Sequence, residues 1–220
     1  MRPIAVDRDD QALQQAFAGD GVIPWTADLR RDGAALAREI LNSQGEVDLL
    51  VNNVGVDRPS RFLELEQEEF DAVFQTNLRG PWFLTRELAR AMVERAGGGS
   101  IVFVSSLHDT FPRGHPHYSA SKAAVTMLVR ELAEELGPYG IRVNSVSPGV
   151  IVSAHVPADK SDDAQIRSRR LIPLGRKGEP IDIARIVSVL LSEQWSSYVT
   201  GANIRVDGGL GAHSWSFDEP

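Results

Sequence analysis

The stretch that decides the fold is "IVFVSSLHDTFPRGHPHYSASKAAV", residues 101–125. Its first four residues are β-branched or aromatic, which is typical of a strand that is buried on both faces. A polar turn with Pro and Gly follows, and an amphipathic helix begins at Tyr118. The apolar residues that share one face of this helix are Val125, Leu128, Val129, Leu132 and Leu136. The stretch therefore predicts a strand, a loop and a helix.

The same alternation continues in both directions along the chain. Short runs rich in Val and Ile predict strands at Ile4–Val6, Val22–Trp25, Val47–Val51, Ile101–Val104, Ile141–Val146 and Ile204–Val206. Amphipathic patterns predict helices at Gln11–Ala18, Ala34–Leu41, Glu66–Phe74, Pro81–Arg95, Tyr118–Leu136 and Pro180–Leu191. This order favours right-handed βαβ crossovers and a Rossmann-like, doubly wound, mostly parallel α/β sheet with helices on both faces. We interpret residues 1–220 as one domain.

Composition excludes several function classes. The chain has 220 residues, a net charge of -7 and no cysteine. Without cysteine there can be no disulfide, thiolate metal site or cysteine nucleophile. No apolar run approaches the length of a membrane span, and the negative charge disfavours a nucleic-acid partner. The sequence thus predicts a cytoplasmic domain that acts on a small molecule, with neither nucleic acid nor membrane as a partner.

Tyr118 and Lys122 form the chemical centre of the quoted stretch. They are four residues apart on a helix, so both side chains lie on one side of it. An isolated tyrosine has a pKa of about 10, and a neighbouring lysine cation lowers this pKa by stabilising the phenolate. Such a tyrosine can exchange a proton with an alcohol or carbonyl oxygen. Because a Tyr-x-x-x-Lys pair alone is more often a solvent-facing helix pair, its context must decide.

The context is a series of motifs at consistent spacing. Polar residues follow several of the predicted strands, where open α/β sheets bind ligands. In chain order the motifs are "NNVG" (52–55), Asn77 in "FQTNLRGPWF", the serine pair 105–106, Tyr118-x-x-x-Lys122, "RVNSVSPGV" (142–150) and "VTGANIRVDGG" (199–209). With these motifs the chain resembles the short-chain dehydrogenase/reductase family, from about Ile4 to Gly209. The resemblance implies a nicotinamide dinucleotide cofactor and hydride transfer between that cofactor and a carbonyl or alcohol carbon.

The resemblance also implies the catalytic residues. Tyr118 would be the general acid/base, and Lys122 would lower its pKa and bind the nicotinamide ribose. Asn77 would complete a proton relay through a water, and Ser106 would orient the substrate oxygen. Alignment of the strand selects Ser106, whereas the commoner spacing to the tyrosine selects Ser105, so Ser105 is the fallback.

Cofactor contacts follow from the same resemblance. Asp7 has the position of the acid that binds the adenine ribose hydroxyls, which favours NAD over NADP. Arg8 beside it could accommodate a 2′-phosphate, so NADP stays open. Gly55 would let the chain pass close to the dinucleotide. The further implied contacts are Asp28, Leu29, Asn52, Asn53, Val54, Tyr118, Lys122, Pro148, Gly149, Ile151 and Ser153.

The loop histidines invite a second interpretation. His108, His115 and His117 with Asp109 could be imagined as a metal site, but no second cluster of carboxylates supports them. We therefore predict that they are loop histidines near the substrate pocket and that the protein binds no metal. The substrate itself stays open among sugars, polyols, hydroxy acids and small ketones.

One family motif is missing. The glycine-rich turn T-G-x-x-x-G-x-G has no counterpart, because neither Gly97–Gly99 nor Gly208–Gly211 joins a strand to a helix. Its backbone donors would each contribute about 1.5–3 kcal/mol to phosphate binding. We expect either that the chain is truncated N-terminally by one βα unit or that the strand at Ile4 closes directly onto the strand at Val47.

The missing turn leaves two functions open. The favoured one is an NAD-dependent oxidoreductase that works as a homotetramer or homodimer, with Pro81–Arg95 and Tyr118–Leu136 at the interface. The alternative is a dehydrogenase-like protein without redox activity, either a ligand-binding regulator or an enzyme of cofactor-independent proton transfer.

Overall fold

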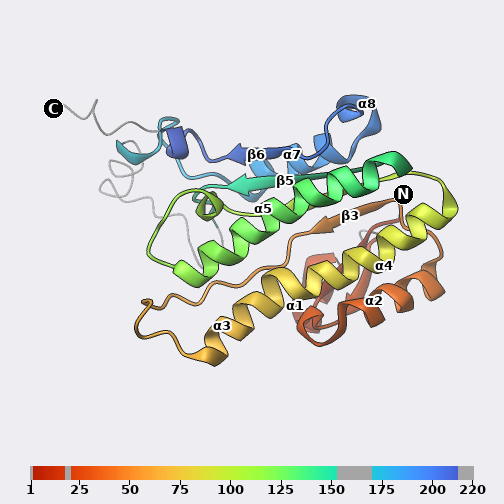
Figure 1. Ribbon diagram of the computed structural model, residues 1–220, viewed down its shortest axis with the longest axis horizontal. Helices are drawn as coiled ribbons and strands as arrows, with labels where there is room; N and C mark the ends of the chain where they lie inside the picture. The colour runs from red at the N-terminus through yellow and green to blue at the C-terminus, as the bar shows by residue number, and fades with distance from the viewer. Residues whose placement is uncertain (1, 18–20, 153–169, 213–220) are drawn as a thin grey trace.

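The computed structural model describes residues 2–17, 21–152 and 170–212. Its strands are β1 (Ile4–Asp7), β2 (Ile23–Thr26), β3 (Leu49–Asn52), β4 (Gly99–Val104), β5 (Ile141–Pro148) and β6 (Asn203–Val206). Its longer helices are α1 (Asp10–Phe17), α2 (Leu29–Gln44), α3 (Gln67–Phe74), α4 (Gly80–Arg95), α5 (Pro116–Leu136) and α7 (Pro180–Leu191). Every predicted strand and helix is confirmed, in a Rossmann-like α/β fold with parallel sheets (Figure 1).

Short helical segments were not predicted. They are the π-helix η1 (Gln75–Arg79), the 3-10 turns η2 (Leu107–Asp109), η3 (Gly137–Tyr139) and η4 (Leu210–Ala212), and α8 (Glu193–Ser196). Within α2, the non-helical Asp32 (φ -157°, ψ 89°) separates a first turn from the predicted helical stretch. Asp28 caps the first turn by accepting from Arg30 N at 3.1 Å, and Asp32 caps the second part by accepting from Ala35 N at 2.9 Å. None of the helices in the described ranges has both the length and the apolar character that a membrane span requires.

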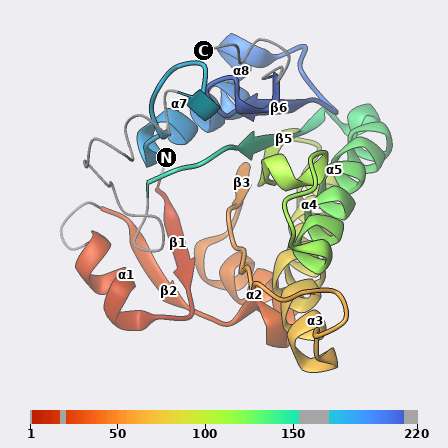
Figure 2. The same cartoon turned by 90° about the vertical axis from the view of Figure 1, so that its left-hand side faces the viewer.

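The strands form two parallel sheets. Four of them lie in the order β3-β4-β5-β6, and β1 pairs with β2 in a separate two-stranded sheet. Among the described residues β1 pairs only with β2, and β3 pairs only with β4. The expected closure of the strand at Ile4 onto the strand at Val47 is therefore wrong. Each of these two strands keeps an edge without a ladder partner, as Figure 2 shows by the separation of β1 from β3.

Strand β4 illustrates how the four-stranded sheet packs between helices. Ile101 and Phe103 pack with α4 and α5, whereas Val102 packs with α7 on the other face. This alternation follows from the two-residue period of a strand. The sheet therefore has helices on both faces, with α4 and α5 on one and α7 on the other.

A cluster on α2 and α4 connects the two sheets. Its buried members are Leu36, Ala37 and Ile40 of α2 with Leu84 and Leu88 of α4. Ile4 and Val6 of β1 pack against this cluster, and so does Leu50 of β3. Val51, which points to the opposite face of β3, is 40% exposed. Both sheets thus pack against the same helices although no ladder connects them.

Candidate active site

Ser106 and Tyr118 meet at the carboxyl end of β4. Ser106 is the N-cap of η2, and its Oγ accepts from His108 N at 3.3 Å. Tyr118 lies in the first turn of α5, which Pro116 begins with its preset backbone angle. The Ser106 hydroxyl lies close enough to the Tyr118 phenol to lower the pKa of that phenol. The structure thus joins a hydroxyl pair of the kind that could bind one substrate oxygen.

Lys122 lies one helical turn after Tyr118 and is 3% exposed. Its Nζ donates to Val104 O at 2.9 Å and lies 5.8 Å from the centroid of the Tyr118 ring. A Cβ atom built on Gly55 would lie 3.1 Å from this Nζ. A larger residue at position 55 would therefore crowd the ammonium group.

Asn77 connects the loop after β3 to α5. It lies in the π-helix η1, a distortion that is frequent at functional sites. Its Oδ1 accepts from Val56 N at 2.8 Å, and its Nδ2 donates to Val56 O and to Ser121 Oγ, both at 3.0 Å. Ser121 Oγ in turn donates to Tyr118 O at 2.7 Å. The four residues predicted to be catalytic are thus close together, and their roles stay predictions.

The pKa values of the pair differ from the sequence-based expectation. Burial raises the pKa of Tyr118, the hydroxyl of Ser106 lowers it, and the negative charge of Asp57 raises it further. The net shift is therefore opposite to the predicted direction, and Lys122 is not among the groups that shift this pKa. Burial also lowers the pKa of Lys122 to about 8, against the opposing charge of Asp109. For Tyr118 and for Lys122, burial shifts the pKa more than the neighbouring groups do, because both side chains are removed from water.

The structure distinguishes the two serines. Ser105 is 3% exposed, and its Oγ lies 3.1 Å from Lys122 O and 3.0 Å from Thr126 Oγ1. It therefore faces the interior between β4 and α5. Ser106 is the serine that contacts the Tyr118 hydroxyl. Alignment of the strand was the better guide to this geometry than the spacing to the tyrosine.

A polar rim made of Asp57, His108 and His115 lies beside Tyr118. His115 Nδ1 is 2.6 Å from Asp57 Oδ2, and the His108 ring meets the Tyr118 ring edge-on with centroids 5.1 Å apart. The two histidine rings are 5.6 Å apart. Sequence reasoning expected the histidines here but missed Asp57. Its position shortly after a buried strand was the signal that could have identified it.

His117 differs from the other two histidines. It is 3% exposed, and neither of its ring nitrogens has a hydrogen-bond partner among the described residues. The prediction that all three histidines line the substrate pocket therefore does not fit the burial of this one.

Two of the predicted cofactor contacts lie at the end of the β1–β2 sheet. Asp7 Oδ1 accepts from Asp9 N at 3.0 Å, so it caps its own turn. Asp28 accepts from Arg30 through both carboxylate oxygens, and this hydrogen bonding lowers the pKa of Asp28. The positive charge of Arg8 lowers the same pKa. Leu29 begins α2 next to this ion pair.

The other predicted contacts follow β3 and β5. Asn53 and Val54 lie between β3 and Gly55. Pro148 ends β5, and a Cβ atom built on Gly149 would lie 2.7 Å from Asp207 Cα, so only glycine fits there. Ile151 forms a bridge with Gly178. Ser153 and most of the predicted substrate-pocket segment Ala154–Pro173 lie outside the described residues.

Fit to a nicotinamide dinucleotide differs between the two halves of that molecule. On the adenosine side, where the family resemblance puts Asn52 and Gly55, Gly55 leaves room beside Lys122, and the buried Asn52 has an Oδ1 atom without a hydrogen-bond partner among the described residues. On the phosphate side, Gly98 turns between α4 and β4 with φ +67°, and Gly208 precedes only the three-residue η4. In the described ranges, therefore, no glycine turn offers a helix N-terminus to the phosphates.

Comparison with known proteins gives the family. Residues 4–211 match a family model described as enoyl-(acyl carrier protein) reductase. The L-rhamnose 1-dehydrogenase (NAD(P)(+)) of Azotobacter vinelandii is 39% identical over 199 residues, which cover 89% of this chain and 77% of that protein. Carbonyl reductase [NADPH] 2 of Sus scrofa is 41% identical over 192 residues, 86% of this chain and 77% of that protein.

A solved structure agrees with these relatives. Acetoin dehydrogenase YohF from Salmonella typhimurium superposes with a TM-score of 0.87 at 29% identity, over 98% of this chain and 88% of that one. Together with the site around Tyr118, these matches mean that the chain belongs to the short-chain dehydrogenase/reductase family of oxidoreductases.

Proposed function

We propose that this chain transfers a hydride between NAD(H) and a small alcohol or carbonyl substrate, with Tyr118 as the general acid/base. The observation that carries the proposal is the closeness of the Ser106 hydroxyl to the Tyr118 phenol, one helical turn from the buried Lys122. The names of the relatives, which are dehydrogenases and reductases, support the same reaction class.

A bound nicotinamide dinucleotide would supply the hydride in reduction and accept it in oxidation. In reduction, the Ser106 hydroxyl would hydrogen-bond the carbonyl oxygen, and the Tyr118 hydroxyl would donate its proton to that oxygen. The Lys122 ammonium would then stabilise the phenolate. The raised pKa of Tyr118 keeps the phenol protonated at neutral pH and so supports its role as the acid. In oxidation the proton returns to Tyr118.

Asn77 would support this transfer from its place beside α5. Its hydrogen bonds to Val56 and Ser121 place it beside the helical turn that carries Tyr118. From there it could complete a proton relay through a water, as the family resemblance implies. We include this relay in the proposal.

We propose NAD as the cofactor, with Lys122 at the nicotinamide ribose and Asp7 at the adenine ribose. The exposed position of Asp7 at the end of β1 supports this choice. Arg8 and Arg30 around Asp28 provide positive charge that a 2′-phosphate would need, and the relatives' names include both nucleotides. A comparison of the two nucleotides therefore belongs to the first experiment.

The polar rim favours a substrate with further oxygen atoms. Asp57 and two imidazoles beside Tyr118 offer several hydrogen-bonding groups within the site. A sugar or polyol fits these groups better than a ketone with one functional group, and the relative from Azotobacter vinelandii is named for L-rhamnose. We also place the reaction in the cytoplasm, as the cysteine-free sequence favours.

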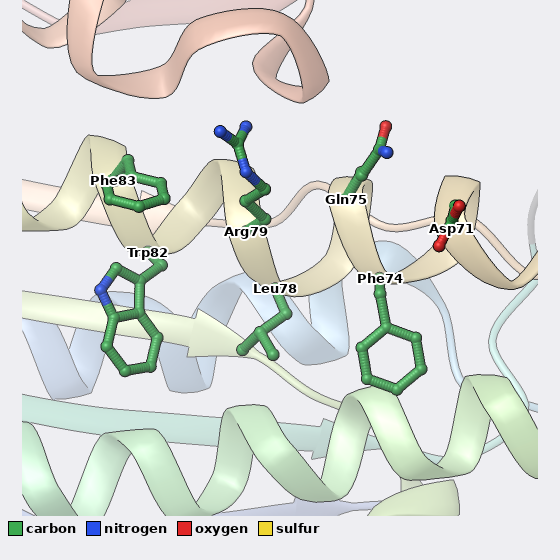
Figure 3. Close-up of a pocket in the computed structure, with 7 residues that line it drawn as sticks. All are labelled: Asp71, Phe74, Gln75, Leu78, Arg79, Trp82 and Phe83. Carbon is green, nitrogen blue, oxygen red and sulfur yellow. The ribbon is translucent and has the colours of Figure 1, made fainter.

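We further propose that the chain forms a homo-oligomer, a tetramer or a dimer, through α4 and α5. A groove of about 260 Å³ is lined by Asp71, Phe74, Gln75, Leu78, Arg79, Trp82 and Phe83. Figure 3 shows Phe74, Leu78 and Trp82 extending to the same side. Trp82 is 46% exposed, and Met127 of α5 is 51% exposed. Burial of such apolar surface against a second copy would stabilise the assembly.

The experiment that tests the reaction is a titration of this chain with NADH and with NADPH, followed by nucleotide fluorescence. It is repeated with a chimaera in which the strand, glycine-rich turn and helix of a dehydrogenase relative precede Met1, since no described strand pairs with the open edges of β1 and β3. Reduction of acetoin and oxidation of L-rhamnose are then measured through NADH absorbance. Oxidation of cyclohexanol, which has a single hydroxyl group, is measured for comparison.

Binding of NADH with turnover of at least one of these substrates is the expected result. Failure of both forms to bind either nucleotide would overturn the proposal. That outcome would instead favour a dehydrogenase-like regulator or a cofactor-independent proton-transfer enzyme, which the relatives' names do not favour.

A further inference from the structure

The carboxylate of Asp109 accepts hydrogen bonds from three elements of the fold. Its Oδ2 accepts from Thr126 Oγ1 of α5 at 2.8 Å, from Ser147 Oγ of β5 at 2.6 Å and from Asn203 Nδ2 of β6 at 2.7 Å. Its Oδ1 accepts from Thr110 Oγ1 at 2.9 Å. A single oxygen with three donors requires strong acceptor character, which a carboxylate has.

These bonds determine where the turn that carries Ser106 lies. Asp109 ends η2, and its backbone N–H donates to Ser106 O at 2.9 Å. The carboxylate therefore ties Ser106 to β5, β6 and α5 at once. Thr126, one of the donors to Asp109, also contacts Ser105 Oγ at 3.0 Å, and Ser105 Oγ lies 3.1 Å from Lys122 O.

The charge of Asp109 also acts on the interior of the site. Lys122 is 3% exposed, and burial of its ammonium group lowers its pKa to about 8. The negative charge of Asp109 raises the same pKa and so opposes the burial. At neutral pH this favours the charged form of the lysine, which is the form that the proposed reaction needs.

We propose that Asp109 is a positioning residue of the reaction, which holds Ser106 against Tyr118 and keeps a negative charge near the ammonium of Lys122. The inference rests on the proposed function, but its charge component does not depend on turnover. The substitution Asp109→Asn distinguishes the hydrogen-bonding role of Asp109 from the role of its charge. Its amide oxygen can still accept two of these hydrogen bonds through its two lone pairs, whereas the negative charge is lost.

The experiment measures the titration of Lys122 directly. The chain has three lysines, so Lys122 can be assigned in the NMR spectrum of ¹⁵N-lysine-labelled protein by its absence in Lys122→Met. In Asp109→Asn we expect Lys122 to lose its proton at a lower pH than in the wild type. Thr110→Ala removes only the bond to the exposed Thr110 hydroxyl and serves as the control, with an unchanged titration.

The second readout is the pH profile of acetoin reduction with NADH. In Asp109→Asn the alkaline limb of the kcat profile should move to lower pH. At pH 8 kcat should fall about tenfold, which is less than the 10²–10⁴-fold that general acid–base catalysis contributes as a whole. The KM for NADH should stay unchanged. If no substrate is turned over, the proposed function fails while the lysine titration still tests the inference.

An unchanged Lys122 titration in folded Asp109→Asn would overturn the inference. An Asp109→Asn chain that does not fold would overturn it too, because the hydrogen bonds of Asp109 would then serve the fold as a whole and not the position of Ser106. Asp109 would then have a purely structural role.

Discussion

Tyr118 and Lys122 show how burial controls the chemistry of a pair that looks simple in the sequence. Burial raises the pKa of Tyr118 and lowers the pKa of Lys122 to about 8. Burial thus favours the neutral form of each group. The tyrosine stays protonated and can donate a proton, whereas the charged form of the lysine is destabilised. The hydroxyl of Ser106 is the contact that favours the phenolate.

Tyr118→Phe tests the proton donor. The phenylalanine keeps the ring and its contact with His108 but removes the hydroxyl that lies close to Ser106. We expect kcat to fall by about 10²–10⁴-fold or more, because general acid–base catalysis contributes that much, while the Kd for NADH stays within about twofold.

Steady-state kinetics and fluorescence titration measure the two quantities. A Tyr118→Phe variant that loses nucleotide binding but keeps residual turnover would assign the residue to binding instead of catalysis.

Lys122→Met tests the cost of the buried ammonium. The folded pKa of about 8 is below the unfolded value of 10.5, so between these pH values the unfolded chain binds more protons and stability rises with pH. Below pH 8 the folded chain bears the whole cost, about 3 kcal/mol at ~1.4 kcal/mol per tenfold change in proton affinity. Methionine removes this cost but also loses the hydrogen bond from the charged ammonium to Val104 O, worth about 1.5–3 kcal/mol.

We therefore expect Lys122→Met to unfold at a higher urea concentration than the wild type at pH 7, by up to about 1.5 kcal/mol in the free energy of unfolding. The gain should shrink as the pH rises from 8 towards 10.5. A variant that is less stable than the wild type at pH 7 would show that the ammonium is not a net cost.

Helices α2 and α4 approach each other at two glycines. A Cβ atom built on Gly80 would lie 2.6 Å from Leu29 O, and one built on Gly33 would lie 2.4 Å from Gly80 O. Such distances are shorter than side-chain contacts permit, so the crossing of these helices requires both glycines. Because this crossing forms the cluster against which β1 and β3 both pack, it determines how the two sheets lie relative to the site.

Gly80→Ala should therefore destabilise the protein by about 2 kcal/mol, the usual cost of overpacking. Gly137→Ala is the matched control, because it has a helical φ of -53° and no heavy atom within 4 Å of its Cβ position. Its stability should be unchanged or slightly raised.

Urea unfolding followed by circular dichroism compares the two variants. Equal stability of Gly80→Ala and Gly137→Ala would mean that the helices separate without cost, contrary to the close approach described above.

The molecule as a whole has two surfaces that its own described residues leave incomplete. The first is the pair of unpaired strand edges on β1 and β3, where no ladder joins the two sheets. The second is the groove on α3, η1 and α4, where Trp82 is 46% exposed. The two differ in chemistry, because an open strand edge offers backbone donors and acceptors and the groove offers apolar side chains.

Trp82→Glu tests the proposed oligomer. A charge in the α4–α5 interface would be desolvated without a partner, so we expect the assembly to dissociate to monomers. Trp195→Glu is the control, since Trp195 is 66% exposed on α8, away from the groove.

Light scattering after size exclusion measures the mass of each form. A wild-type chain that is monomeric, or a Trp82→Glu chain of unchanged mass, would exclude α4 and α5 as the interface.

By itself the sequence determined the six strands, the six longer helices and the common face of Tyr118 and Lys122, because these depend on short-range periodicity. Only the tertiary structure decided that the strands form two sheets, that Ser106 and not Ser105 contacts Tyr118, and that burial sets the direction of both pKa shifts. Asp57 pairs with a residue 58 positions away, and Asp109 with one 94 positions away. Contacts of that range depend on how elements pack, and no local pattern records them.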